Sequence, residues 1–519
     1  MNRKMQNLNS KLAGILLAFA FQSTAATFYF PSSENSNLQD TVNAARDGDT
    51  IVVAPGSYSL TNQVTITNAL TLRSAQGAGL TTLNAENNNW CLWISNSLAV
   101  ADGFTISSLG AEYSAGGIFC VGGTIQNCTF TNTVVGPGPG TVTMAGGILS
   151  NSVVGLRATG AAFYPIGIYC THTGLVTHCQ ILGSGSGNAG PEVYLEDSQL
   201  ADSLVTGVHV YPDPPASPVS AVQALNSTIV GCTIRDNTSG NSPGGGANLN
   251  NCLMDRCVIA HNTCFAGLGG GIFETNSVIR NSLIVSNSSG MDYMPEYGPG
   301  GLGGGVYMQG GALVNCTVVE NTAISCPTNG TGYGAGVYVA GGGITNSILF
   351  DNFFYACDQS EGDWYNPGKA IFDHSCTAPD PGGAANVLQD PRFLDLANGD
   401  FHLATNSPCL GAGIVQSWMA GATDLDGNPR TGNGNADIGA YQTLATNPLP
   451  PSLRICATAT NTLIVAWPAN AAGYVLERNT QSGSSGWIGE SATPAMVNGE
   501  NQISITPGQG RMFYRLRRP

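Results

Sequence analysis

Short alternations of apolar and polar residues organise the middle of this sequence, and no stretch keeps the period of a long helix. A unit recurs that begins Gly-(Ile/Val)-(Phe/Tyr), places Cys or Ser nine residues after the aromatic residue, and places Asn five residues later. Tyr307, Cys316 and Asn321 belong to one such unit. Each unit therefore predicts short strands that are separated by Gly or Asn.

The spacing of the units predicts the fold. Successive small residues lie 24 to 34 residues apart, as from Cys179 to Ser203 and from Ser282 to Cys316. Strands repeated at this length without helices fit a coil in which each turn hydrogen-bonds to the next, whereas a β-propeller needs about four strands in every 40–50 residues. We expect an all-β chain, a right-handed parallel β-helix solenoid, and a small β-sandwich domain after it.

Stacking turns about 4.8 Å apart makes each repeated position a column of neighbouring side chains. One inward column is expected to hold small residues, and a second is expected to hold Asn side chains with left-handed backbone and amides that bond along the axis. Parallel thiols do not point at one another as a disulfide requires, so we expect these cysteines to be reduced and structural. The columns hold Cys128, Cys179, Ser203, Cys232, Cys257, Ser282, Cys316 and Ser347, and Asn237, Asn262, Asn287, Asn321 and Asn352.

The aromatic residue of each unit follows an apolar residue, so strand alternation predicts that the rings point outward. Outward rings offer surfaces on which sugar rings stack; the alternative is that the rings stack on each other or are covered by insertions. The candidates for glycan binding are Tyr169, Tyr194, Phe273, Tyr307 and Tyr338, with Phe119 in the same column and Trp364 from an insertion.

Two acidic residues stand one position before successive Asn residues of the second column. Glu320 and Asp351 are predicted to lie one turn apart. Carboxyl groups about 5 Å apart are the pair that a retaining glycosidase uses, and such a pair splits its two pKa values. The alternative is that both are solvated turn residues.

Insertions in a solenoid tend to project from one face and to carry function. The insertion over residues 354–372 is acidic and holds the only lysine beyond residue 26. Polysaccharide lyases need a strong base, so this lysine and the neighbouring carboxylates are further catalytic candidates: Asp358, Glu361, Asp363 and Lys369. Cys357 and Cys376 flank the insertion and are the expected disulfide pair.

One short motif suggests a metal ion. Asp424-x-Asp426-x-Asn428 is similar to the start of an EF-hand loop, but Asn435 stands at the twelfth position, where such a loop has Glu. Calcium is therefore the one cofactor for which the sequence offers candidate ligands.

Composition and net charge limit the classes of molecule that the protein is expected to bind. Only 10% of residues are charged, and the net charge is −15. Residues 1–26 have a basic start, an apolar run and a small-residue exit, which predicts a signal peptide. Because they hold three basic residues and no acidic one, their removal leaves a charge of −18. A chain with this negative charge is a poor partner for nucleic acid, which is itself negatively charged. After residue 26, no apolar run reaches the ~18 residues that a membrane-spanning helix needs.

Three segments resemble known families. Gly48-Asp49-Thr50-Ile51 and Pro55-Gly56-Ser57-Tyr58 resemble the first strand and turn of pectin-lyase-like right-handed β-helix proteins. Asp390-Pro391-Arg392-Phe393 and Asp437-Ile438-Gly439-Ala440-Tyr441 resemble the choice-of-anchor Q segment, which commonly precedes a surface anchor. The tail, with Leu463-Ile464-Val465-Ala466-Trp467, is similar to fibronectin-III-like modules. Together with the leader pattern and the Pro-rich linker, these resemblances predict the following parts: signal peptide 1–26, β-helix 27–389, capping segment 390–445, linker 446–451 and β-sandwich 452–519.

The expected function is binding of extended polysaccharide by an exported protein, outside the cell or at its surface, with a cell-envelope anchor as a second partner. A polysaccharide lyase or glycoside hydrolase is one alternative, although the Gly-His-Gly and Asp-Asp patterns of polygalacturonases are absent. An adhesin-like structural spacer is another, because this fold hosts many functions.

Overall fold

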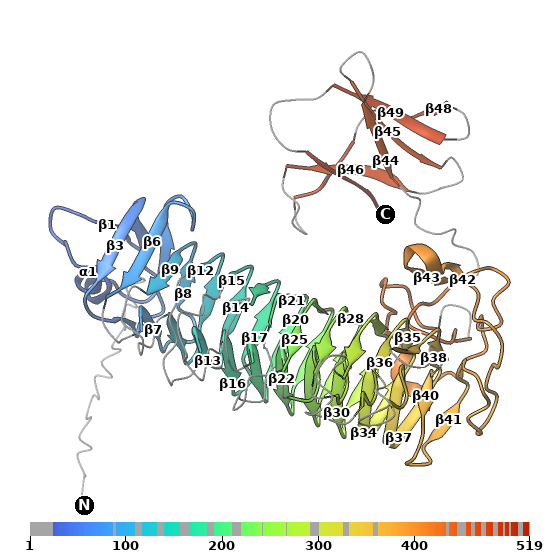
Figure 1. Ribbon diagram of the computed structural model, residues 1–519. Coiled ribbons are helices and arrows are strands. Elements are labelled where there is room, and N and C mark those ends of the chain that lie inside the picture. The colour runs from blue at the N-terminus through green and yellow to red at the C-terminus, as the bar shows by residue number, and fades with distance from the viewer. Residues whose placement is uncertain are drawn as a thin grey trace, which may run out of the picture. The chain divides into compact units, whose positions relative to one another are not determined.

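The protein is represented by a computed structural model in which the chain divides into two compact units, Met1–Gln442 and Thr443–Pro519. The first unit is a row of stacked β-strand turns (Figure 1). The structure describes residues 24–86, 90–108, 117–131, 140–155, 167–183, 191–209, 220–240, 242–265, 267–290, 300–324, 332–355, 362–431, 435–443, 453–457, 462–468, 474–480, 486–490, 492, 494–497, 500–506 and 512–517.

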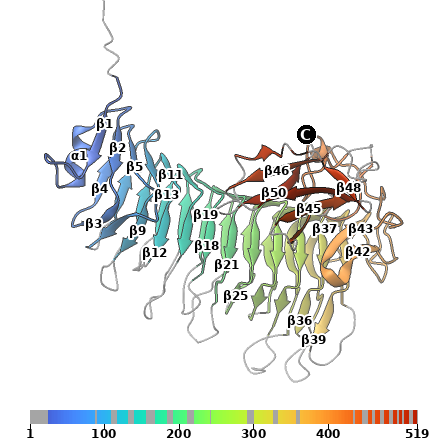
Figure 2. The ribbon, with the colours of Figure 1, turned by 90° about the horizontal axis from the view of Figure 1, so that it is seen from above.

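Each turn contributes short strands that pair in parallel with the same strands of the turns before and after it. In one turn these are β10 (Ile118–Cys120), β11 (Thr124–Gln126) and β12 (Thr129–Thr131). The first two belong to a sheet of 24 strands, named sheet A here, and the third to a sheet of 12 strands, named sheet B. Five later turns each add one strand to a further sheet, named sheet C: β25 (Thr238–Ser239), β29 (Thr263–Cys264), β33 (Ser288–Ser289), β36 (Thr322–Ile324) and β39 (Phe353–Tyr355). Figure 2 shows the turns side by side from a second direction, and the predicted parallel β-helix is confirmed.

A short helix covers the open end of the first turn. The helix, α1 (Leu38–Ala44), lies between β1 (Thr27–Phe30) and β2 (Thr50–Val53). Asn37 begins it, because its Oδ1 accepts a hydrogen bond of 2.9 Å from the Gln39 N–H. Leu38 and Val42 are buried against the coil, so the helix keeps water from the apolar interior.

The inward column of small residues is present as predicted. Cys232, Cys257 and Ser282 lie on successive turns, and the Cys257 N–H donates to Ser282 Oγ over 3.1 Å. All cysteines of this column are buried and free of disulfides. Burial raises the pKa of the Cys128 thiol to about 12, which keeps it protonated and unreactive.

The Asn column forms a hydrogen-bonded chain along the axis, the Asn ladder. Asn262 Nδ2 donates to Asn287 Oδ1 over 2.9 Å, and the Asn262 N–H donates to the same oxygen over 3.0 Å. The pattern repeats through Asn237, Asn262, Asn287, Asn321 and Asn352. At the end of the ladder, the backbone N–H and the Nδ2 of Asn352 both donate to Oδ1 of Asp363.

The prediction of left-handed backbone at these Asn residues was wrong by one position. The residues with positive φ are those just before them, including His261 at 53° and Ser286 at 54°. The Asn side chain must turn inward to bond along the axis, so the residue before it makes the sharp corner. The repeated Gly has a related reason: a Cβ on Gly271 would lie 2.9 Å from Asn287 Cγ and 2.8 Å from the Gly305 carbonyl oxygen.

Residues 390–442 pack on the outer face of sheet B. Phe401 of β43 (Asp400–Leu403) is buried with Leu283 and Val285 of β32 (Leu283–Val285) and Val319 of β35 (Thr317–Val319). Arg430 is fully buried, and its Nε donates to Asn281 Oδ1 over 2.7 Å. The segment is therefore part of the first compact unit.

The second unit contains two antiparallel sheets with a common core. One sheet holds β44 (Arg454–Ala457), β45 (Leu463–Pro468), β48 (Ala495–Val497) and β49 (Glu500–Ile505); the other holds β46 (Val475–Asn479), β47 (Ile488–Gly489) and β50 (Phe513–Arg517). Val465, Trp467 and Ile503 pack with Leu476 of the second sheet, as the predicted β-sandwich requires.

Several predicted segments lie outside the described residues, namely 1–23 of the leader and the linker 446–451. Within the described parts of the chain, no helix is both long and apolar enough to cross a membrane.

Candidate functional site

The most extended arrangement of outward side chains lies on the first strand of each turn in sheet A. The strands are β7 (Leu92–Ile94), β10, β13 (Val142–Ala145), β16 (Ile168–Thr171), β19 (Val193–Glu196), β22 (Val222–Leu225), β26 (Ala247–Asn250), β30 (Ile272–Thr275), β34 (Val306–Val314), β37 (Val337–Thr345) and β40 (Trp364–Tyr365). Their register aligns one column, the aromatic column: Trp93, Phe119, Thr143, Tyr169, Tyr194, Gln223, Asn248, Phe273, Tyr307, Tyr338 and Tyr365.

The rings of this column stack on each other. The centroids of Tyr307 and Tyr338 are 4.8 Å apart with planes 7° from parallel, and those of Tyr169 and Tyr194 are 5.0 Å apart at 5°. Partial burial raises the pKa of the Tyr307 and Tyr338 hydroxyls. Each ring covers its neighbour's face, which is one of the two alternatives that the sequence left open, so the column presents ring edges and hydroxyls to solvent.

Trp364 does not belong to the column. It aligns with the buried Val337, packs against the core, and its ring lies 5.5 Å from that of Phe372. Tyr365 aligns with Tyr338 instead, at 5.5 Å between ring centroids. Alternation along β40 explains the difference, since neighbouring residues of a strand point to opposite faces.

Polar residues separate the aromatic runs. Thr143 lies between Phe119 and Tyr169, while Gln223 and Asn248 lie between Tyr194 and Phe273. No member of the column is charged. Uncharged hydroxyls, amides and ring edges at one strand spacing make a surface that suits a long neutral ligand with many hydroxyls.

The candidate carboxylates Glu320 and Asp351 lie away from this column, at the corner between sheets B and C. They are one turn apart, as predicted, because the Glu320 N–H donates to the Asp351 carbonyl oxygen over 3.1 Å. Both occupy the left-handed corner positions, and Glu320 Oε2 accepts a bond of 3.3 Å from Ser286 Oγ. A catalytic role for this pair stays a prediction.

The structure separates the other two catalytic candidates. Asp363 is buried and ends the Asn ladder, with its Oδ1 2.9 Å from Asn352 Nδ2. Lys369 is exposed in a turn with left-handed backbone. Asp358, Glu361 and Cys357 lie outside the described residues. Cys376, the other half of the expected disulfide, is buried in one cluster with Cys409.

The motif proposed for calcium forms a turn held by the chain's own donors. Asp424 Oδ1 accepts from the backbone N–H groups of Asp426 and Asn428, and its Oδ2 accepts from Gln442 N–H over 2.6 Å. Asp426 Oδ2 lies 2.7 Å from His402 Nε2. Among the residues that the structure describes, no cluster of three or more His, Cys, Asp or Glu side chains is arranged to hold a metal ion.

His402 bridges two carboxylates in this segment. Its Nδ1 lies 2.5 Å from Asp400 Oδ1, opposite the contact with Asp426, and its ring centroid lies 4.2 Å from that of Tyr441. The hydrogen bond to Asp426, aided by the one to Asp400, raises the pKa of His402 to about 9, against the desolvation that lowers it. The imidazolium of His402 therefore links β43, through Asp400, to the turn that holds Asp426.

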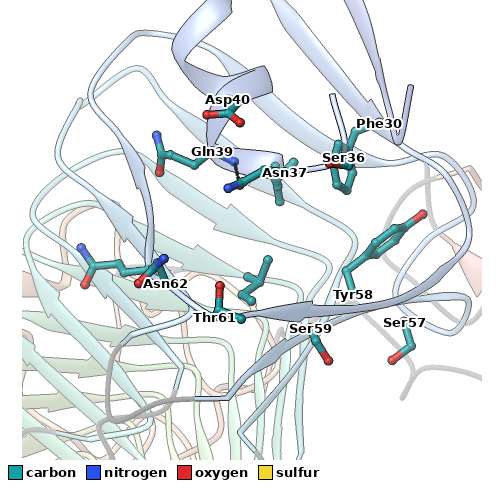
Figure 3. A pocket seen from close by; sticks show the side chains of 13 residues that line it. Phe30, Ser36, Asn37, Gln39, Asp40, Ser57, Tyr58, Ser59, Thr61 and Asn62 are labelled. Carbon is teal, nitrogen blue, oxygen red and sulfur yellow. Dashed lines mark hydrogen bonds between the residues drawn. The ribbon is translucent and has the colours of Figure 1, made fainter. Parts of the chain in front are cut away.

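A cavity of about 410 Å³ lies between the start of α1 and the first strand of sheet B, β3 (Gly56–Leu60). Residues 36–40 and 57–63 line it together with Phe30. Figure 3 shows the beginning of the helix on one side and Thr61 and Asn62 on the other, while Ser57 and Ser59 point away. No sequence pattern indicates this cavity, because its two walls meet only when the helix packs on the coil.

Comparisons with known proteins agree with this fold. Residues 166–354 match the family model for a right-handed β-helix region, whereas no curated protein matches the chain in sequence. An alginate lyase, AlyF-OU02 in complex with G6, is 14% identical with a TM-score of 0.37 over 82% of this chain and 97% of its own. Pectate lyase Pel9A is 13% identical with a TM-score of 0.34 over 81% and 97%. The match to the family model agrees with the stacked parallel strands, so the coil of the first compact unit is a right-handed parallel β-helix.

Proposed function

We propose that the protein binds an extended polysaccharide along the aromatic column of sheet A. The observation that carries this proposal is the single file of uncharged side chains from Trp93 to Tyr365, in which every ring and amide is exposed or partly buried and only Thr143 is buried. A polymer that lies along the axis meets similar groups at each turn, about 4.8 Å apart, so weak contacts add up.

The hydroxyl edges are the groups that we expect to contact the ligand. Stacking covers the ring faces inside each run, while the hydroxyls of Tyr307 and Tyr338 make no hydrogen bond with any residue that the structure describes. A sugar hydroxyl can donate to or accept from each of them. The ring stack keeps these side chains in place before binding, which lowers the entropic cost of association.

The charge of the chain favours a neutral glycan. The column itself is uncharged and the whole protein carries −15, so an acidic polysaccharide is repelled at low salt. We place the interaction outside the cell or at its surface, on the strength of the signal-peptide pattern in residues 1–26.

The test is retention of the purified protein on immobilised β-glucan, xylan, mannan, pectate and alginate. Tyr307→Phe/Tyr338→Phe keeps the ring stack and removes only the hydroxyls, so it should weaken retention several-fold at an unchanged melting temperature. Tyr307→Ala/Tyr338→Ala should abolish retention and also lose about 0.5–1.5 kcal/mol for each stacked pair that it breaks.

Tyr29→Phe/Tyr355→Phe is the matched control, because both rings are exposed and lie outside the column. Retention that is equal in the Tyr307/Tyr338 and control variants contradicts the proposal. Release of products with an unsaturated end that absorb in the ultraviolet identifies a lyase instead. If the protein shows neither retention nor turnover, a structural spacer is the function that remains.

A further inference from the structure

The cavity beneath the N-terminal cap has an apolar floor and a polar mouth. Phe30, Leu38 and Leu60 are buried at its base, and the Tyr58 ring lies 5.3 Å from that of Phe30. Polar side chains line the rest of the cavity: Ser36, Asn37, Gln39, Asp40, Thr61 and Asn62 (Figure 3). An apolar base under a ring of donors and acceptors is the usual build of a small-molecule site.

The rim is fixed before any ligand arrives. Gln39 Oε1 accepts from the Thr65 N–H over 2.6 Å, and its Nε2 donates to Asn43 Oδ1 over 2.8 Å. Asn37 is held by its bond to the Gln39 N–H, and Tyr58 donates its hydroxyl proton to the Ala54 carbonyl oxygen over 2.9 Å. A rim held in this way loses little entropy on binding.

Asp40 and Asn62 are two of the polar side chains of the lining that lack a hydrogen-bond partner among the described residues; Ser36 is another. Asp40 and Asn62 come from opposite walls (Figure 3). A carboxylate accepts only, while an amide both donates and accepts. Together they match a ligand that carries several hydroxyl groups.

The charge of the lining selects among such ligands. Asp40 is the only charged residue described around the cavity, and Lys and Arg are missing from its lining. Phosphates, sulfates and uronic acids would therefore meet repulsion without a compensating cation. A volume of about 410 Å³ is at the small end for ligand sites and suits one or two sugar rings rather than a long chain.

We infer that the cavity between α1 and β3 binds a neutral mono- or disaccharide through Asp40 and Asn62, with its apolar side on the floor of Phe30, Leu38 and Leu60 and on the neighbouring Tyr58 ring. This site is separate from the aromatic column, and its existence does not depend on the proposed binding of a polymer there. Gln39 nevertheless connects the two, because it is bonded to Thr65, which aligns with Trp93 at the start of the column.

Saturation-transfer NMR on the full chain tests the inference with cellobiose, maltose, lactose, mannobiose and xylobiose, and with digalacturonate as the acidic counterpart. At least one neutral disaccharide should give a signal, and digalacturonate should give none at low salt. Asp40→Ala/Asn62→Ala should weaken binding at least tenfold. Both residues are exposed, so the melting temperature should hardly change.

Glu34→Gln is the control for charge, since Glu34 is exposed near the cap but does not line the cavity. The inference is overturned if none of the neutral sugars binds, if the double variant binds as well as the parent, or if digalacturonate binds equally. Tyr307→Phe/Tyr338→Phe should keep disaccharide binding, so failure of this site and failure of the column give different results.

Discussion

Replacing Asn287 by Ala measures what the Asn ladder contributes. The substitution removes four buried hydrogen bonds: two from Asn262 to Oδ1, at 3.0 and 2.9 Å, and two from Nδ2 to the Ile259 carbonyl oxygen and to Asn321 Oδ1, both at 2.9 Å. At about 1 kcal/mol net for each bond the loss is about 4 kcal/mol, and the buried Asn262 N–H left without an acceptor adds to it.

Urea unfolding followed by circular dichroism gives the overall change, and hydrogen exchange with mass spectrometry locates it. The N–H groups of Asn262 and its neighbours should lose protection first, because the opening is local to the turns that share the missing side chain. Asn248→Ala is the matched control, as Asn248 is half-buried on the outer face of sheet A, and it should cost less than about 0.5 kcal/mol.

The reasoning fails if Asn287→Ala costs no more than Asn248→Ala. Asn287→Asp is a second test variant. Its carboxylate still accepts from Asn262, but one carboxylate oxygen replaces the Nδ2 donor and repels Asn321 Oδ1, so the protein should be less stable at neutral pH. Its stability should recover in acid, where the protonated carboxyl group donates again.

Four more outcomes are expected. Asp363→Asn should leave stability nearly unchanged, because the amide oxygen still accepts from Asn352, whereas Asp363→Ala should cost about 2 kcal/mol in urea unfolding; equal losses would contradict its role as ladder terminus. The His402 contribution is complete below its unfolded pKa of about 6.5 and is lost as pH rises through about 9, so the melting temperature of the parent should fall more steeply than that of His402→Gln over this interval. Arg430→Lys should cost about 2 kcal/mol in the same urea titration, because the Nε bond to Asn281 disappears; no change would mean that the charge alone matters. Alkylation of the folded protein, read by peptide mass spectrometry, should modify the half-buried Cys456 and spare Cys257, and rapid labelling of Cys257 would show that the turns open.

The columns could be predicted from the sequence because a parallel coil stacks like on like. Once the repeat is aligned, Cys232 must lie next to Cys257 and Asn262 next to Asn287 on successive turns, whatever the loops do. The same alignment missed Tyr365, since the pattern around Trp364 is interrupted by an insertion and only the strand register shows which of the two rings points outward.

The features that the sequence did not reveal depend on contacts between distant segments. Leu283, Val285 and Val319 were signals of a covered outer face, because their strands lose the usual alternation, but nothing local indicates that Phe401 covers them. Asp363 looked like a catalytic acid because an acidic insertion surrounds it, and its bond to Asn352 follows only from the chain path. The cavity beside Asp40 likewise forms between two segments that meet on folding.

The Asn ladder has a direction, and this sets how the solenoid can change in length. Each Asn donates from Nδ2 to the next turn and accepts at Oδ1 from the turn before, so any Asn can be followed by another Asn. The carboxylate of Asp363 only accepts, so it fits only the last position of the ladder. Duplication or loss of a whole turn inside the ladder leaves both ends chemically intact. Evolution can therefore extend or shorten this surface by single turns, as long as a side-chain oxygen that accepts from the last Asn is kept.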